Sequence, residues 1–100
     1  MKYTIQISEV AQADLQLIYD YLYRFTFSKS TVEKFHDEVY STIFSLQLFP
    51  NMYPKFDDIY RIITVRKQYR ILYEVDEIKK QVIISSIIAS KSNISKNFGF

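Results

Sequence analysis

Two amphipathic segments, separated by only a few residues, constrain the fold of this chain most. Their apolar residues recur at steps of three and four: Ala11, Leu15, Ile18 and Leu22, then Val32, Phe35, Val39, Ile43 and Leu46. Such spacing puts each set on one face of a helix. Because the connection is short, the pattern predicts an antiparallel helical hairpin whose apolar faces pack on each other or on a sheet.

The helix bounds follow from end signals in the sequence. Ser8 is placed to cap the first helix. The helix should run to about Arg24, because the spacing of apolar residues at steps of three and four does not continue into Phe25-Thr26-Phe27. The second helix begins at the capping box Ser30-Thr31-Val32-Glu33, or earlier at Ser28. Pro50 is expected to end it.

Strand patterns flank the two helices. Residues 2–7 alternate polar and apolar side chains, and three more strands are expected at about 59–66, 69–76 and 81–89. Residues 82–89 are apolar on both faces, so this strand should be central and more covered than its neighbours. This order predicts an α+β fold, in which an antiparallel meander pairs with the first strand and packs on the helical hairpin.

Composition predicts one domain over residues 1–100. The chain is 48% apolar and 17% aromatic, which suffices for a core without disulfides or metal. A polar tail from about residue 90 is expected to be mobile. The sequence contains neither an apolar run of membrane-spanning length nor a signal-peptide pattern, so we expect a cytoplasmic protein without a membrane partner.

Several kinds of chemistry are excluded by residue content. The chain has no Cys and one His, which argues against thiol catalysis and Cys/His zinc sites. Its single glycine, Gly99, leaves no phosphate-binding glycine loop or dinucleotide fingerprint. His36 lies mid-helix beside Asp37 without a serine-hydrolase motif, so a surface role is favoured. We expect neither a cofactor nor a metal.

Charge is distributed unevenly along the chain. Residues 1–58 carry five Lys or Arg against eight Asp or Glu, a net charge of −3, whereas residues 59–100 carry eight against three, a net charge of +5. Such an asymmetry favours binding of nucleic acid or of an acidic protein. Alternatively, the cations are solvated residues on a sheet edge that discourage aggregation.

Arg66, Lys67 and Arg70 surround the connection between two of the expected strands. If Arg61 and Arg70 both lie on the face away from the helices, they can converge on a phosphate, which guanidinium groups bind bidentately. Nearby tyrosines would then stack on bases: Tyr60, Tyr69 and Tyr73. In the alternative interpretation, the tyrosines belong to the core and Arg70 pairs with Glu74 or Asp76.

Ordered motifs resemble the RelE/ParE toxins of bacterial type II toxin–antitoxin modules. The similarity covers residues 3 to about 91 and rests on Ile7-Ser8-Glu9-x-Ala11-x-x-Asp14-Leu15-x-x-Ile18-x-x-Tyr21, Leu46-x-x-Phe49-Pro50, Tyr60-Arg61 and Tyr69-Arg70-Ile71-Leu72-Tyr73-x-Val75. It implies a helical hairpin on one curved antiparallel sheet and a growth-inhibiting toxin active in the stress response.

The resemblance implies two possible targets. RelE-like members cleave messenger RNA in the ribosomal A site, whereas ParE-like members inhibit DNA gyrase and have no catalytic activity of their own. Arg61 and Arg70 match two basic positions of the nuclease branch, and Lys91 would join them. Other positions depart from that branch: Ile63, Ser92 and Phe98.

The predicted helices are long, as in ParE-like members, so gyrase inhibition is the leading interpretation. A ribosome-dependent mRNA endonuclease is the alternative, and an inactive remnant that serves as an interaction module is the third. The resemblance also implies an acidic antitoxin, encoded adjacently, that mediates most binding to operator DNA. The residues expected to bind the target or the antitoxin are Arg61, Arg66, Lys67, Tyr69, Arg70, Tyr73 and Lys91.

Overall fold

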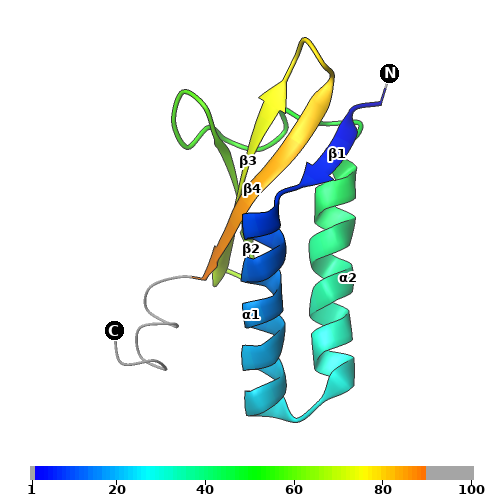
Figure 1. Ribbon diagram of the computed structural model, residues 1–100, viewed down its shortest axis with the longest axis vertical. Helices are drawn as coiled ribbons and strands as arrows, with labels where there is room; N and C mark the ends of the chain where they lie inside the picture. The colour runs from blue at the N-terminus through cyan, green and yellow to red at the C-terminus, as the bar shows by residue number, and fades with distance from the viewer. Residues whose placement is uncertain (1, 90–100) are drawn as a thin grey trace.

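The computed structural model describes residues 2–89 and has the predicted α+β order (Figure 1). Its elements are β1 (Thr4–Ile7), α1 (Glu9–Thr26), α2 (Lys29–Ser45), β2 (Arg61–Val65), β3 (Tyr69–Asp76) and β4 (Gln81–Ala89). The bounds expected for β3 and β4 are confirmed, whereas β1 and β2 are shorter than expected. In the described part of the chain, neither helix combines the length and apolarity needed to cross a membrane.

The four strands form one sheet in the order β1-β4-β3-β2. Strands β2, β3 and β4 make the predicted antiparallel meander, and β1 pairs in parallel with β4. The inner position of β4 is confirmed. Its expected coverage is wrong, because both helices lie on one side of the sheet (Figure 1) and Ile88 on the other face remains 49% exposed.

Helix α1 begins as predicted and ends two residues later than expected. The Ser8 hydroxyl oxygen accepts the Ala11 N–H at 3.1 Å, which caps the first turn. Thr26 stays helical while its hydroxyl donates to the Leu22 carbonyl at 2.7 Å. Phe27 then leaves the helix in the left-handed conformation, with φ 50°, a position more often filled by glycine.

Helix α2 starts at the earlier of the two sites considered and stops before Pro50. Ser28 is its cap and accepts the Thr31 N–H at 3.2 Å, so the capping box expected at Ser30 is wrong. At the other end, the Ser45 hydroxyl donates to the Thr42 carbonyl at 2.6 Å. The Leu46 N–H donates to the Ile43 carbonyl, three residues back, rather than to the Thr42 carbonyl as in an α-helix. The helix therefore ends in tighter turns at this point, before it reaches Pro50.

The core lies between the helical hairpin and one face of the sheet. Helix residues such as Leu15 and Phe35 meet Tyr69 and Ile71 of β3, and the Phe35 and Tyr69 ring centroids are 4.8 Å apart. The largest fully buried side chains come from both layers: Phe35, Val39, Ile43, Leu46, Ile63, Ile71, Tyr73, Val82 and Ile84. The predicted apolar faces of both helices therefore meet the sheet.

A β-bulge interrupts β4 and is held by the start of α1. Tyr73 pairs with Ile84 and Leu72 pairs with Ser86, which leaves Ser85 without a partner on β3. The Ser8 hydroxyl donates to the Ser85 carbonyl at 2.9 Å, and the Asp14 carboxylate accepts the Ile87 N–H at 2.9 Å. The extra residue explains why Ile84 and Ile87, three positions apart, both point into the core.

Candidate functional site

The predicted cation cluster is built on a strained turn between β2 and β3. The Gln68 N–H donates to the Val65 carbonyl at 3.2 Å, and the two central residues, Arg66 and Lys67, have φ of 53° and 62°. This is the φ pattern of a type I′ turn, which suits the hairpin twist but favours Gly or Asn. For residues with a Cβ, the left-handed region costs about 1 kcal/mol each. The turn thus displays two exposed cations at some cost in stability.

Arg66 is already paired within the chain. Its Nε donates to Glu38 Oε1 of α2 at 2.7 Å, and its guanidinium lies 5.3 Å from the Phe35 ring centroid. The two side chains of the pair are 37% and 42% exposed, so the pair contributes less than about 1 kcal/mol. Lys67 is exposed and belongs to no ion pair formed within residues 2–89.

Arg61 and Arg70 lie on opposite faces of the sheet, so the condition for their convergence on one phosphate is not met. Arg61 pairs with the buried Tyr73, and its Nη1 donates to the Tyr53 carbonyl at 2.7 Å on the helix side. Arg70 pairs with Thr64 and Ile88 on the face that the helices leave uncovered, which we call the open face.

Arg70 lacks the carboxylate partner that was considered for it. Within residues 2–89, its Nη1 is buried without a hydrogen bond, and neither Glu74 nor Asp76 forms an ion pair with it. Asp76 instead accepts the N–H groups of Ile78 and Lys79, both at 3.0 Å. A buried donor without a partner costs about 1–3 kcal/mol, so an added acceptor at Arg70 would be favourable.

The tyrosines of β3 are core residues and offer no stacking surface. Tyr69 is 5% exposed and Tyr73 is fully buried, which corrects their expected role in binding and confirms the alternative interpretation. The Tyr73 hydroxyl donates to the Pro50 carbonyl at 2.7 Å, and burial raises the pKa of Tyr73 to about 12. Burial also raises the pKa of Tyr69.

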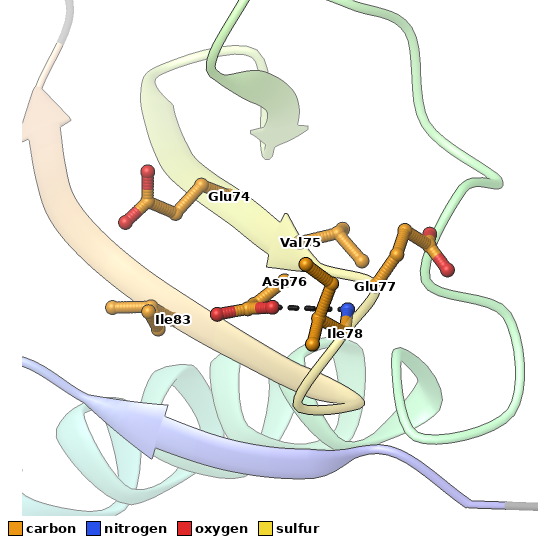
Figure 2. Close-up of a pocket in the computed structure, with 6 residues that line it drawn as sticks. All are labelled: Glu74, Val75, Asp76, Glu77, Ile78 and Ile83. Carbon is orange, nitrogen blue, oxygen red and sulfur yellow. Dashed lines mark hydrogen bonds between the residues drawn. The ribbon is translucent and has the colours of Figure 1, made fainter.

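Three carboxylates, Glu74, Asp76 and Glu77, gather around the β3–β4 hairpin, at the end of β3 away from Arg70. Figure 2 shows them around a shallow hollow lined by Glu74, Val75, Asp76, Glu77, Ile78 and Ile83. The Tyr3 hydroxyl donates to Glu77 at 2.6 Å, which lowers the Glu77 carboxyl pKa. Across residues 2–89, no three His, Cys, Asp or Glu side chains are placed to hold a metal ion.

Sequence reasoning missed an apolar strip on the open face. Cross-strand register puts four branched aliphatic side chains there, and none packs against the core cluster: Ile62, Leu72, Ile83 and Ile88. The signal was present in residues 82–89, which are apolar on both faces, whereas the two helices within residues 2–89 cover only one face of the sheet. Lys91, Ser92, Phe98 and the expected mobile tail lie outside the described residues.

Comparison with known proteins gives a family match over most of the chain. The sequence model for the ParE toxin of the type II toxin–antitoxin system parDE matches residues 5–93. The comparison with curated proteins found no match.

Solved toxin–antitoxin structures have a similar fold. The chromosomal ParDE system from P. aeruginosa is 21% identical with a TM-score of 0.72, over 88% of this chain and 96% of that one. The RelBE2 complex from Mycobacterium tuberculosis is 19% identical with a TM-score of 0.62, over 90% and 93%. A mutant E. coli RelE in the free state is 16% identical with a TM-score of 0.55, over 97% and 93%.

Proposed function

Because this chain belongs to the ParE family of type II toxin–antitoxin toxins, we propose that it inhibits growth by inhibiting DNA gyrase and that a cognate antitoxin neutralises it. The long helical hairpin, with helices of 18 and 17 residues, supports gyrase inhibition, because long helices are what the resemblance implied for ParE-like members. An antitoxin partner is supported by similar folds in solved toxin–antitoxin complexes, including the intact E. coli RelBE complex.

The placement of Arg61 and Arg70 carries the choice of gyrase over messenger RNA. Cleavage through a 2′-hydroxyl needs a group to take its proton, a group to protonate the leaving oxygen and cations that share one phosphate. Arg61 and Arg70 flank the sheet from opposite sides and cannot share a phosphate in this register. This argues against the endonuclease alternative, in which Arg61, Arg70 and Lys91 line one site.

The charges of the open face argue in the same direction. On β2, β3 and β4 this face carries one cation, Arg70, and two carboxylates, Glu74 and Asp76. Arg70 and Glu74 are four residues apart on one strand, about 13 Å, too far to act together on one phosphodiester. A phosphate backbone would meet net negative charge there.

Two assays run in parallel test the proposed target. Purified chain added to DNA gyrase should block supercoiling or trap cleaved DNA, and it should leave messenger RNA on programmed ribosomes uncut. Cutting at the ribosomal A site that Arg70→Ala abolishes would establish the endonuclease instead. If the chain neither inhibits gyrase nor cuts messenger RNA, and cells grow normally when it is induced, it is an inactive interaction module.

The antitoxin is proposed to be an acidic protein encoded beside this chain. Its acidic residues would complement the net charge of +5 over residues 59–100. The complex would bind operator DNA mainly through the antitoxin, and the module would act in the cytoplasm. Induction of the chain alone should arrest growth, and co-expression of the adjacent gene should restore it.

A further inference from the structure

The connection between α1 and α2, residues 24–29, which we call the hairpin tip, lies beyond the end of the sheet (Figure 1). Phe25 is 62% exposed and Phe27 is 81% exposed, and the Tyr23 and Phe27 ring centroids lie 6.5 Å apart. Phe27 has φ of 50°, a left-handed conformation that is costly for a residue with a Cβ. Large apolar side chains exposed together mark an interaction surface. The hairpin tip thus presents an aromatic ring to solvent on a strained backbone.

A shallow groove lies between α1 and α2 beside the hairpin tip, and we call it the hairpin groove. Its lining includes the apolar surfaces of Tyr19, Tyr23 and Val32 and the carboxylates of Asp20 and Glu33. The Tyr19 hydroxyl is buried and has no hydrogen-bond partner within residues 2–89. The hairpin groove therefore combines aromatic side chains with two negative charges.

The charges of the tip and the groove are opposite in sign. Arg24 and Lys29 lie at the hairpin tip, whereas Asp20 and Glu33 lie about one helical turn further from it. Asp20 and Arg24 are four residues apart on α1, and so are Lys29 and Glu33 on α2, a spacing that suits ion pairs within a helix. Neither pair forms an ion pair in the part of the chain that the structure describes. All four exposed charges are therefore available to a partner.

We propose that the hairpin tip of one chain docks into the hairpin groove of a second copy of this chain, while the second tip docks into the first groove. The Phe27 ring of each tip packs against Tyr19 and Tyr23 of the other copy. The two cations of each tip then meet the two groove carboxylates of the other copy. Because every copy carries both a tip and a groove, the contact is reciprocal about a two-fold axis and closes as a dimer. This dimer does not depend on which target the chain inhibits.

Two other occupants fit the tip and the groove less well. A DNA backbone or an anionic membrane would attract Arg24 and Lys29, but it would be repelled by Asp20 and Glu33 beside them. These four side chains have no net charge. Cations followed by carboxylates suit a partner with the reverse order, and a second copy in antiparallel orientation supplies that order.

Charge exchange between two variants tests the reciprocal contact. One variant of the full chain carries both tip reversals, Arg24→Glu and Lys29→Glu, and the other carries both groove reversals, Asp20→Lys and Glu33→Lys. Sedimentation over about 10 μM to 1 mM should show a wild-type dimer. Each variant alone should dimerise at least about 10-fold more weakly, because like charges then meet in both contacts. An equimolar mixture should form dimers within about 3-fold of the wild-type affinity, because every tip meets a groove of opposite charge.

The control for the charge exchange lies in the loop before β2. Lys55→Glu and Asp58→Lys reverse one exposed cation and one exposed carboxylate outside the tip and the groove. These reversals should change the dimer dissociation constant less than about 3-fold.

Removal of the Phe27 ring tests the apolar part of the contact. Phe27→Asn keeps a residue that tolerates the left-handed conformation, so the turn should persist without the ring. This variant should dimerise at least about 10-fold more weakly, because burial of a phenyl ring is lost in both contacts. Phe56→Asn is the matched control, since Phe56 is 59% exposed and lies in the loop before β2. Circular dichroism confirms that each variant is folded.

Each contrary result has a distinct meaning. A wild-type chain that stays monomeric at about 1 mM, or dimers that Phe27→Asn leaves unchanged, would overturn the reciprocal contact. A mixture of the two charge variants that dimerises no better than its components would overturn it as well. If the monomeric chain bound vesicles of phosphatidylglycerol and phosphatidylcholine, and Phe27→Asn alone abolished this binding, a membrane would replace the second copy as the occupant of the tip. None of these results would alter the family assignment.

Discussion

The Asp14 carboxylate on α1 accepts the Ile87 backbone N–H on β4 at 2.9 Å, two residues after the β-bulge at Ser85. Strand β1 has ended by this point, since its last paired residue, Ile7, faces Ile84. A helix side chain thus satisfies a backbone donor of β4 that β1 does not reach.

Asp14→Ala should lower the free energy of unfolding by about 1–3 kcal/mol, because the half-buried Ile87 donor loses its acceptor. Urea denaturation at neutral pH measures the change. Asp20→Ala is the control, since Asp20 lies on the exposed side of the same helix and accepts a hydrogen bond from the side chain of Gln16. Its effect on the free energy of unfolding should stay within about 0.5 kcal/mol. Equal effects of both variants would contradict the role given to Asp14.

Tyr73→Phe should destabilise the chain by about 1–3 kcal/mol. It removes the 2.7 Å hydrogen bond to Pro50 and leaves a buried carbonyl without its donor. Thermal and urea unfolding give the value. Tyr23→Phe serves as the control because Tyr23 is 45% exposed, and it should change the free energy of unfolding by close to zero. An unchanged free energy of unfolding in Tyr73→Phe would show that the Pro50 carbonyl finds another donor.

Stability should fall as the pH rises from about 10 towards 12. Burial raises the pKa of Tyr73 and of Tyr19 to about 12, from the ordinary value of 10.0. A raised folded-state pKa means that the unfolded chain loses its proton first, so the stabilisation is complete below pH 10 and disappears as the pH passes through the folded-state value. Urea midpoints at several pH values test this, and Tyr73→Phe should flatten the decline. A constant midpoint up to pH 11.5 would contradict it.

Lys67→Gly should raise the free energy of unfolding by about 1 kcal/mol. Lys67 has φ of 62°, a region that glycine occupies without a steric cost, and it forms no ion pair in the described part of the chain. The melting temperature measures the gain. Gln68→Gly should not stabilise, because Gln68 is not among the residues with positive φ. If Lys67→Gly lowered the melting temperature, the lysine side chain would have to make a stabilising contact of its own.

Local patterns predicted the helices well and the sheet faces poorly. The stripe from Ala11 to Leu22 reports burial directly, because its period depends on the helix alone. The face of Arg70 depends on the turn. Strands ending at 66 and resuming at 69 leave a two-residue loop and put Arg61 and Arg70 on one face. In the structure, Val65 pairs with Tyr69 across a three-residue loop, and this shift of one residue turns Arg70 to the other side.

The residues of the turn did not predict the register that pairs Val65 with Tyr69. Type I′ turns are usually marked by Asn and Gly, whereas this turn uses Arg66 and Lys67. The open-face strip was missed for a related reason. Apolar residues on both faces of 82–89 predict a strand more covered than its neighbours, whereas α1 and α2 both lie on one side of the sheet (Figure 1). The pairing of Glu38 with Arg66, 28 positions away, likewise depends on tertiary structure that no sequence window contains.

The parallel pairing of β1 with β4 also bears on synthesis. Residues 4–7 find their partners at 81–84, and the bulge that Ser8 and Asp14 hold lies at 85–87. A growing polypeptide leaves the ribosome from its N-terminus, so β1 cannot pair until residues 81–84 have been translated and have left the ribosome. A product truncated before β4 therefore cannot form the native sheet, and a nascent chain cannot present the complete open face before β4 emerges.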